Sequence, residues 1–306
     1  MRHVSNLGAN AFFLAAFTLL LPFQVFFGIR YRTWGFLVGM VCGLILEILG
    51  YTARVALSKD VDLFLMYLVT LTIGPAFFSA AVYLCLARII AVYGHHLALF
   101  RPLVYTAVFI LLDFFALLLQ SGGGALVGGD DPSMWDTGLS LLQAGLSIHL
   151  VGIVIYAVLC GDFALRVFRA RGKWRGDFAK LQFSTRFKSF CYALGAATLA
   201  ILIRTAFRVG ELGQGFDSKI AKSEPAFLVL DGTMILAACI CLTVYHPGPC
   251  FQGRWPEADF SLKVDRGRGK NPKSCHREQI LAGVHVKLAS LITYEKLERR
   301  SSTGYS

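Results

Sequence analysis

Seven long apolar runs alternate with short polar segments along the chain. They are Leu7–Gly28, Trp34–Val55, Leu63–Leu86, Pro102–Ser121, Gly138–Cys160, Ser189–Gly210 and Pro225–Tyr245. About 20 apolar residues are enough for an α-helix to cross a bilayer, and a helix satisfies its own backbone groups in lipid. The first run has no small-residue cleavage site and leads directly into the second, so we interpret it as a retained span. The pattern predicts an all-α membrane protein, a bundle of seven transmembrane helices.

Composition supports the membrane class. Of 306 residues, 56% are hydrophobic and only 16% are charged, and the mean hydropathy is +0.59. Soluble domains contain about 25% charged residues. The excess apolar content is therefore explained by the seven predicted spans.

Lysine and arginine are distributed unequally between the two sets of polar segments. The N-terminus and the segments after the second, fourth and sixth spans contain four, whereas the opposite segments contain 23. Because positive charge stays in the cytosol, we expect the N-terminus outside and the C-terminus in the cytosol, with the plasma membrane as the location. The net charge of +11 then belongs to a cytosolic face suited to anionic inner-leaflet lipids rather than to nucleic acid. The predicted outside segments contain no cysteine, which argues against a disulfide framework.

The second span contains an ionisable stripe. Glu47, Tyr51 and Arg54 follow one another at i, i+4 and i+7, so they share one face of a helix. An unpaired charge in hydrocarbon costs about 2.5 kcal/mol or more. We therefore expect this stripe to face the interior, toward Asp113, the arginines of the sixth span and Asp231.

Further polar residues interrupt the later spans. With the predicted orientation most of them lie in the outer half of the membrane: Asp113, Gln120, Arg204, Arg208, Glu211 and Asp231. Ionisable groups inside a membrane are functional candidates by default, so we predict a ligand-binding polar chamber in that half. The alternative is a network of paired charges that only fixes the packing of the helices, and both roles can coexist. His149 is a weaker candidate, since a single buried histidine is more often a hydrogen-bonded packing residue.

Two stretches carry local signals. Pro75 lies within the third span and is followed by small residues, which predicts a bend and a closely approaching neighbour. The glycine-rich segment Gln120–Asp131 lacks the Lys-Ser/Thr of a phosphate-binding loop. We expect it to form a flexible acidic loop outside the membrane.

Several motifs together resemble the fungal RTA-like family of lipid-translocating exporters and aminocholesterol-resistance proteins. They are EILGYTAR, GPAFFSAAVYLCLAR, Asp113 with QSGGG, RTAFRVGELGQGF, Glu224 with Asp231, and HPG at 246–248. The resemblance covers all seven spans in order. It implies a seven-helix fungal membrane protein linked to export or translocation of sphingoid bases and related lipids, to resistance against toxic amphiphiles, and in some members to porphyrin uptake.

The resemblance also points to individual residues. Glu47, Tyr51 and Arg54 match the family's ExxGYxxR pattern, Arg204, Arg208 and Glu211 its RxxxRxxE pattern, and Asp113, Gln120 and Asp231 its isolated polar positions. His149 departs from the family's usual glutamine and Leu228 from its usual tyrosine. Both departures lie on helices expected to line the chamber, and they leave the identity of the substrate open.

The chemistry agrees with a lipid ligand. Acidic side chains in the outer half suit the cationic amine of a sphingoid base, while its tail remains in lipid. Without a P-loop, ATP hydrolysis by this chain is not expected, which leaves facilitated flipping, a lipid-sensing receptor or a regulator of another transporter. A retinal protein would need a lysine in a span core, and a metal hydrolase would need clustered histidines. We therefore predict a protein that is not an enzyme and has no cofactor and no metal site.

The C-terminal tail is expected to be a separate module. We divide the chain into a transmembrane domain, 1–248, and a basic cytosolic tail, 249–306. Within the tail, Phe251–Ser274 has the composition of an unfolded segment, whereas residues 277–300 place apolar side chains at helical spacing. This amphipathic helix would lie on the inner leaflet or bind a cytosolic protein partner, unless it remains solvated.

Overall fold

A computed structural model describes residues 7–57, 63–99, 101–129, 131–170, 172, 174–213 and 224–258 of the chain. This part is helical and contains no strand. Seven helical segments in it are long and apolar enough to cross a membrane, which confirms the predicted all-α membrane class and the predicted number of spans. The candidate tail helix at 277–300 lies outside the described residues.

The spans are formed by eight helices and one π-helical turn. The first six are α1 (Leu7–Arg30), α2 (Trp34–Leu57), α3 (Phe64–Tyr93), α4 (Pro102–Val127), α5 (Trp135–Arg169) and α7 (Thr185–Gly213), and the seventh joins α8 (Glu224–Phe227), the π-turn η4 (Leu228–Thr233) and α9 (Met234–Val244). Short connections contain η1 (His95–Leu97), η2 (Pro132–Met134), η3 (Gly176–Phe178), α6 (Ala179–Phe183) and α10 (Pro247–Cys250).

Several helices extend beyond the apolar runs that predicted them. α3 continues to Tyr93 and α5 continues to Arg169. The last turn of α5 contains Arg166 and Arg169, and cations at a helix C-terminus interact favourably with the helix dipole. The apolar pattern thus located the part of each helix that suits hydrocarbon, and the polar ends continue past it.

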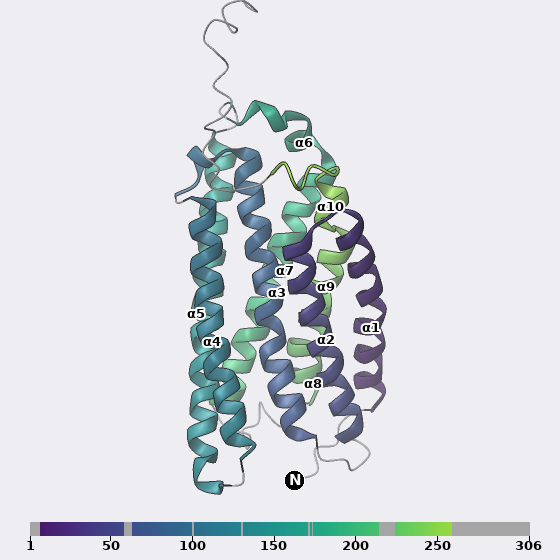
Figure 1. Cartoon of the computed structure of the whole chain (residues 1–306), viewed down its shortest axis with the longest axis vertical. Coiled ribbons are helices and arrows are strands. Elements are labelled where there is room, and N and C mark those ends of the chain that lie inside the picture. Colours follow the sequence, from purple (N-terminus) through teal and green to yellow (C-terminus); the bar gives the residue numbers. More distant parts are fainter. Residues whose placement is uncertain are drawn as a thin grey trace, which may run out of the picture. The chain divides into compact units, whose positions relative to one another are not determined.

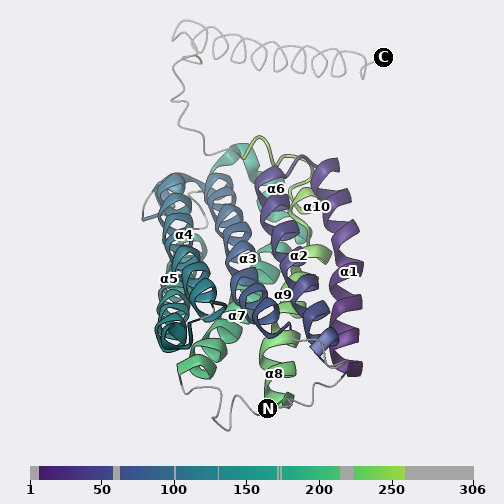
Figure 2. The same ribbon diagram turned by 60° about the horizontal axis from the view of Figure 1, so that its bottom comes forward.

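The helices pack as a closed ring in which α3 is the most central member. α1 contacts α2, α2 contacts α3, α3 contacts α4, α4 contacts α5, α5 contacts α7, α7 contacts α9, and α9 returns to α1; α3 also contacts α5 and α7. Figures 1 and 2 show α1 and α5 at opposite edges of the bundle, with α3 between them. The burial of the two helices agrees with this arrangement. In the most apolar stretch of α3 78% is buried, whereas in that of α1 only 22% is buried.

The glycine-rich segment differs from its prediction as a loop. α4 continues through Gly122, Gly123 and Gly124 to Val127. A Cβ atom at Gly123 would lie 2.6 Å from the carbonyl oxygen of Gly138 on α5. The two backbones approach closely because glycine has no side chain. These glycines therefore belong to a helix–helix contact. A glycine-rich sequence is also typical of a loop, which is why the prediction was wrong.

The packed part of the chain also extends past the expected boundary at residue 248. His246 precedes α10, and its Nδ1 accepts a hydrogen bond from the Gly248 amide at 3.1 Å. Burial lowers the pKa of His246 to about 4, so its imidazole is neutral at physiological pH. The Phe251 ring is fully buried and lies 5.1 Å from Phe187 and 5.6 Å from Phe190. Residues 249–258 are thus packed with the bundle, and a separate tail stays a prediction for residues 259–306 alone.

Candidate functional site

Six of the predicted site residues form one buried group, here named the arginine–carboxylate cluster. Its members come from α2, α7 and η4 and are at most 6% exposed: Glu47, Tyr51, Arg204, Arg208, Glu211 and Asp231. They lie toward the end of the bundle where α1 begins and α2 and α7 end. The predicted concentration of charge in one half of the bundle holds for this group.

Asp231 connects the two arginines of α7. The guanidinium of Arg208 donates from Nε to Oδ1 at 2.6 Å and from Nη2 to Oδ2 at 3.2 Å. The Nε atom of Arg204 lies 3.1 Å from the same Oδ1. Paired donors on one carboxylate are a strong, directional arrangement. Asp231 therefore neutralises charge on both arginines at once.

The two arginines form two further hydrogen bonds, one within α7 and one to α3. Arg208 Nη1 donates to Oε2 of Glu211 at 3.0 Å. Arg204 Nη2 donates to the carbonyl oxygen of Leu71 on α3. Pro75 has no N–H with which to bond that carbonyl four residues earlier. The proline therefore frees a backbone acceptor inside the bundle, and Arg204 occupies it.

Glu47 and Tyr51 have the least satisfied polar atoms of the cluster. Neither oxygen of Glu47 nor the hydroxyl of Tyr51 has a hydrogen-bond partner among the described residues. The nearest cation, Nη2 of Arg204, lies 3.8 Å from Oε1 of Glu47. A buried carboxyl group without hydrogen bonds is costly, so Glu47 and Tyr51 retain unused hydrogen-bonding capacity. A Cβ at Gly74 would lie 3.0 Å from Glu47 Oε1, so the glycine lets the carboxyl group of Glu47 pack against α3.

The π-turn η4 positions the seventh span against α2. It places Asp231 and Gly232 on the buried side together. A Cβ at Gly232 would lie 2.6 Å from the Tyr51 hydroxyl. The Tyr51 ring in turn lies 5.2 Å from Phe13 and 5.6 Å from Phe17. The π-turn was not predicted from the sequence, although π-turns are frequent at functional sites.

Arg54 lies at the edge of the cluster. Its Nε donates to Oδ1 of Asn10 at 2.9 Å. Its guanidinium carbon lies 3.9 Å from the centre of the Phe227 ring, and that of Arg208 lies 4.8 Å from the same ring. Sequence reasoning missed Asn10 and Phe227. The polar Asn10 in the first apolar run was the available signal for one of them.

Asp113 does not join this group, which corrects the expectation that the Glu47 stripe faces it. Oδ1 of Asp113 lies 3.0 Å from Nδ1 of His149, and Nε2 of His149 lies 3.5 Å from the Ser79 hydroxyl. All three side chains are buried and come from α4, α5 and α3. His149 is thus hydrogen-bonded within the bundle.

Gln120 occupies a third position, between α4 and α5. It is 1% exposed, and its Oε1 has no hydrogen-bond partner among the described residues. A Cβ at Gly145 would lie 2.8 Å from its Cγ. The Gln120 side chain thus packs against the backbone of α5 at Gly145. The polar residues predicted to line one chamber therefore lie in two separate clusters and at one separate amide.

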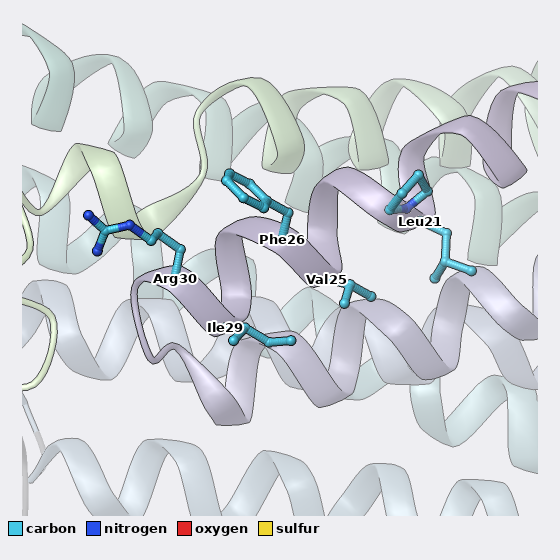
Figure 3. A pocket seen from close by; sticks show the side chains of 6 residues that line it. Leu21, Val25, Phe26, Ile29 and Arg30 are labelled. Carbon is cyan, nitrogen blue, oxygen red and sulfur yellow. The ribbon is translucent and has the colours of Figure 1, made fainter.

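One depression on the described surface lies away from these groups. It has a volume of about 600 Å³ and is lined by Leu21, Pro22, Val25, Phe26, Ile29 and Arg30. Figure 3 shows that these side chains all come from α1. The lining of this groove is apolar except for Arg30. None of its six lining residues belongs to the arginine–carboxylate cluster.

Comparison with known proteins finds relatives of this chain in yeast. Residues 40–254 match the protein family described as RTA1 like protein. The sphingoid long-chain base transporter RSB1 of Saccharomyces cerevisiae (strain Lalvin EC1118) is 31% identical over an alignment that covers 99% of this chain and 86% of the relative.

Two further yeast proteins are similar over shorter ranges. Protein RTM1 of Saccharomyces cerevisiae is 27% identical, covering 69% of this chain and 67% of the relative. Protein RTA1 of the same species is 26% identical, covering 70% and 66%. No solved structure matches the chain.

Proposed function

Because the chain belongs to the RTA1-like family, we propose that it binds and translocates amphiphilic lipids of the sphingoid-base type. The resemblance found in the sequence motifs is confirmed, and the chain is a multi-pass membrane protein with a lipid transporter among its relatives. The proposal extends to export of such lipids and to resistance against toxic amphiphiles. The ligand is moved without being chemically changed.

The observation that carries the proposal is the unsatisfied pair Glu47 and Tyr51. Two carboxyl oxygens and one hydroxyl lie buried without hydrogen-bond partners among the described residues. A sphingoid base offers an amine and hydroxyl groups, which are the donors that these oxygens lack. The neighbouring arginines and carboxylates (Arg54, Arg204, Arg208, Glu211 and Asp231) hold the site in shape. Asp113 and Gln120 are proposed as further polar contacts along the path.

Reconstitution tests the function directly. Purified protein in liposomes should accelerate transbilayer movement of a labelled sphingoid base, without ATP, more than movement of labelled phosphatidylcholine. Protein-free liposomes and the Glu47→Gln variant are the controls. Binding of the base without any acceleration would contradict translocation and favour a lipid-sensing receptor or a regulator of another transporter.

The orientation of the bundle is a separate prediction. The unequal distribution of lysine and arginine favours an orientation with Leu57 and Gly213 at the outer end and Arg30 and Arg169 at the cytosolic end. In a cysteine-free background, Ser133→Cys should react with an impermeant maleimide on intact cells, whereas Ser274→Cys should react only after permeabilisation. The opposite labelling pattern would put the arginine–carboxylate cluster in the inner half.

The cellular surroundings of the protein form part of the same proposal. We propose the plasma membrane as its location. Anionic inner-leaflet lipids are the expected partners of the basic cytosolic segments, and a cytosolic protein is an alternative partner of the tail.

A further inference from the structure

A small pocket lies at the opposite end of the bundle from the arginine–carboxylate cluster, where α2 begins and α3 ends. Its volume is about 230 Å³, and it is lined by Arg32, Trp34, Gly35, Phe36, Leu84, Arg88, Trp255 and Pro256. These eight residues include two arginines and no carboxylate. The lining therefore favours an anion.

The first turn of α2 adds to this positive potential. The carbonyl oxygen of Thr33 accepts a hydrogen bond from the Leu37 amide at 2.8 Å, which places Thr33 at the N-cap. The next three residues, 34–36, line the pocket, and their amides have no acceptor within the helix. The Thr33 hydroxyl is fully buried and has no hydrogen-bond partner among the described residues. Such a helix N-terminus attracts anions.

Arg32 has an unusual backbone conformation, and the side chain of Arg88 is held by contacts within the bundle. Arg32 has a φ of 54°, a left-handed conformation that is uncommon for residues other than glycine and is often found at ligand sites. Arg88 donates from Nη1 to the carbonyl oxygen of Trp255 at 2.9 Å, and its guanidinium carbon lies 5.0 Å from the centre of the Trp255 ring. The guanidinium of Arg88 is thus fixed against the pocket wall.

The surroundings of the pocket match the interface of a membrane. Trp34 is 57% exposed at the start of an apolar span, and tryptophan is enriched where spans meet the headgroups. The apolar groove on α1 ends at Arg30, two residues before Arg32. We propose that this pocket binds the phosphate of an anionic phospholipid, through Arg32, Arg88 and the first-turn amides of α2. The site is separate from the proposed substrate site, and it rests on the proposed orientation and on the proposed role of anionic inner-leaflet lipids.

Lipid titration followed by native mass spectrometry tests this site on the full-length protein in detergent. Phosphatidylserine should bind more tightly than phosphatidylcholine. Arg32→Gln and Arg88→Gln should each weaken phosphatidylserine binding about tenfold, since each removes a charge-assisted contact. Arg169→Gln, which removes an exposed arginine of α5 outside the pocket, should weaken phosphatidylserine binding much less than either pocket variant, because it removes only a general contact of the basic face.

A second variant separates binding from folding. Arg32→Gly removes the guanidinium but supplies the residue that adopts a φ of 54° without strain. We expect its melting temperature to equal or exceed that of the wild type, while phosphatidylserine binding falls as it does in Arg32→Gln. Equal binding by the wild type and Arg32→Gly would overturn the proposal. Displacement of the lipid by millimolar inorganic phosphate would overturn its assignment to a phospholipid and identify a free-anion site instead.

Discussion

Asp231→Asn is expected to destabilise the bundle by about 3–5 kcal/mol, the usual cost of removing one partner from a buried ion pair. The substitution preserves the size of the side chain and removes the charge. Arg204 and Arg208, each at most 1% exposed, lose the carboxylate that both contact. The expected result is a large fall in melting temperature and in the yield of monodisperse protein, measured by thermal unfolding in detergent.

Asp162→Asn is the matched control. Asp162 pairs with Arg166 at 2.7 Å on the exposed side of α5, where both side chains are more than 40% exposed. Exposed pairs contribute less than about 1 kcal/mol, so this variant should melt close to the wild type. The double variant Asp231→Asn with Arg208→Gln should be less destabilised than the sum of its single changes, because one unpaired cation has been removed. Similar melting of the Asp231 and Asp162 variants would show that the arginines do not depend on Asp231.

Glu47→Gln should have the opposite effect to Asp231→Asn: the variant should fold normally but lose lipid transport. Neither Glu47 oxygen has a hydrogen-bond partner among the described residues, and Arg204 keeps its contact with Asp231. The amide retains the shape but cannot pair with a lipid amine as a carboxylate does. Hydrogen bonds to charged groups contribute about 1.5–3 kcal/mol, and about 1.4 kcal/mol corresponds to tenfold. Translocation of a sphingoid base should therefore fall about tenfold or more.

Melting temperature and transport must be measured on the same Glu47→Gln preparation. Tyr51→Phe is the companion variant, because it removes the neighbouring hydroxyl and keeps the ring against Phe13 and Phe17. We expect it to reduce transport less than Glu47→Gln. If Glu47→Gln instead lowered the melting temperature while transport per folded molecule stayed normal, Glu47 would have a structural role only. Normal stability with normal transport would refute both roles.

Asp231→Asn and Glu47→Gln together distinguish the two roles that the sequence left open for these residues, a network of paired charges and a ligand site. A network of paired charges and a ligand site both require buried ionisable groups, so composition and spacing cannot distinguish them. In the folded chain, two carboxyl groups of one cluster have different environments. Asp231 accepts hydrogen bonds from Arg208 and forms an ion pair with Arg204, whereas Glu47 lies 3.8 Å from the nearest arginine. The expected division is therefore between a structural Asp231 and a ligand-binding Glu47.

The number of spans, their approximate positions and the inward direction of the Glu47 stripe could all be predicted from the amino-acid sequence. The physical reason is that hydrocarbon imposes a minimum apolar length and a high cost on exposed charge, and both constraints act on each segment separately. The position of Pro75 was also visible. Its consequence could not be predicted. The proline frees the carbonyl oxygen of Leu71, and Arg204, which occupies that acceptor, lies 133 residues further along the chain.

Which polar groups meet one another became apparent only from the packing of the helices. Asp113 and Asp231 are both single carboxylates in apolar spans, yet one faces His149 and the other faces two arginines. Partner choice depends on the rotation and relative height of neighbouring helices, which helical periodicity within one span does not contain. The same holds for Gly123, whose role as a contact with α5 depends on which helix lies opposite. Local sequence thus specifies which residues must be buried, and packing between helices specifies what each of them is buried against.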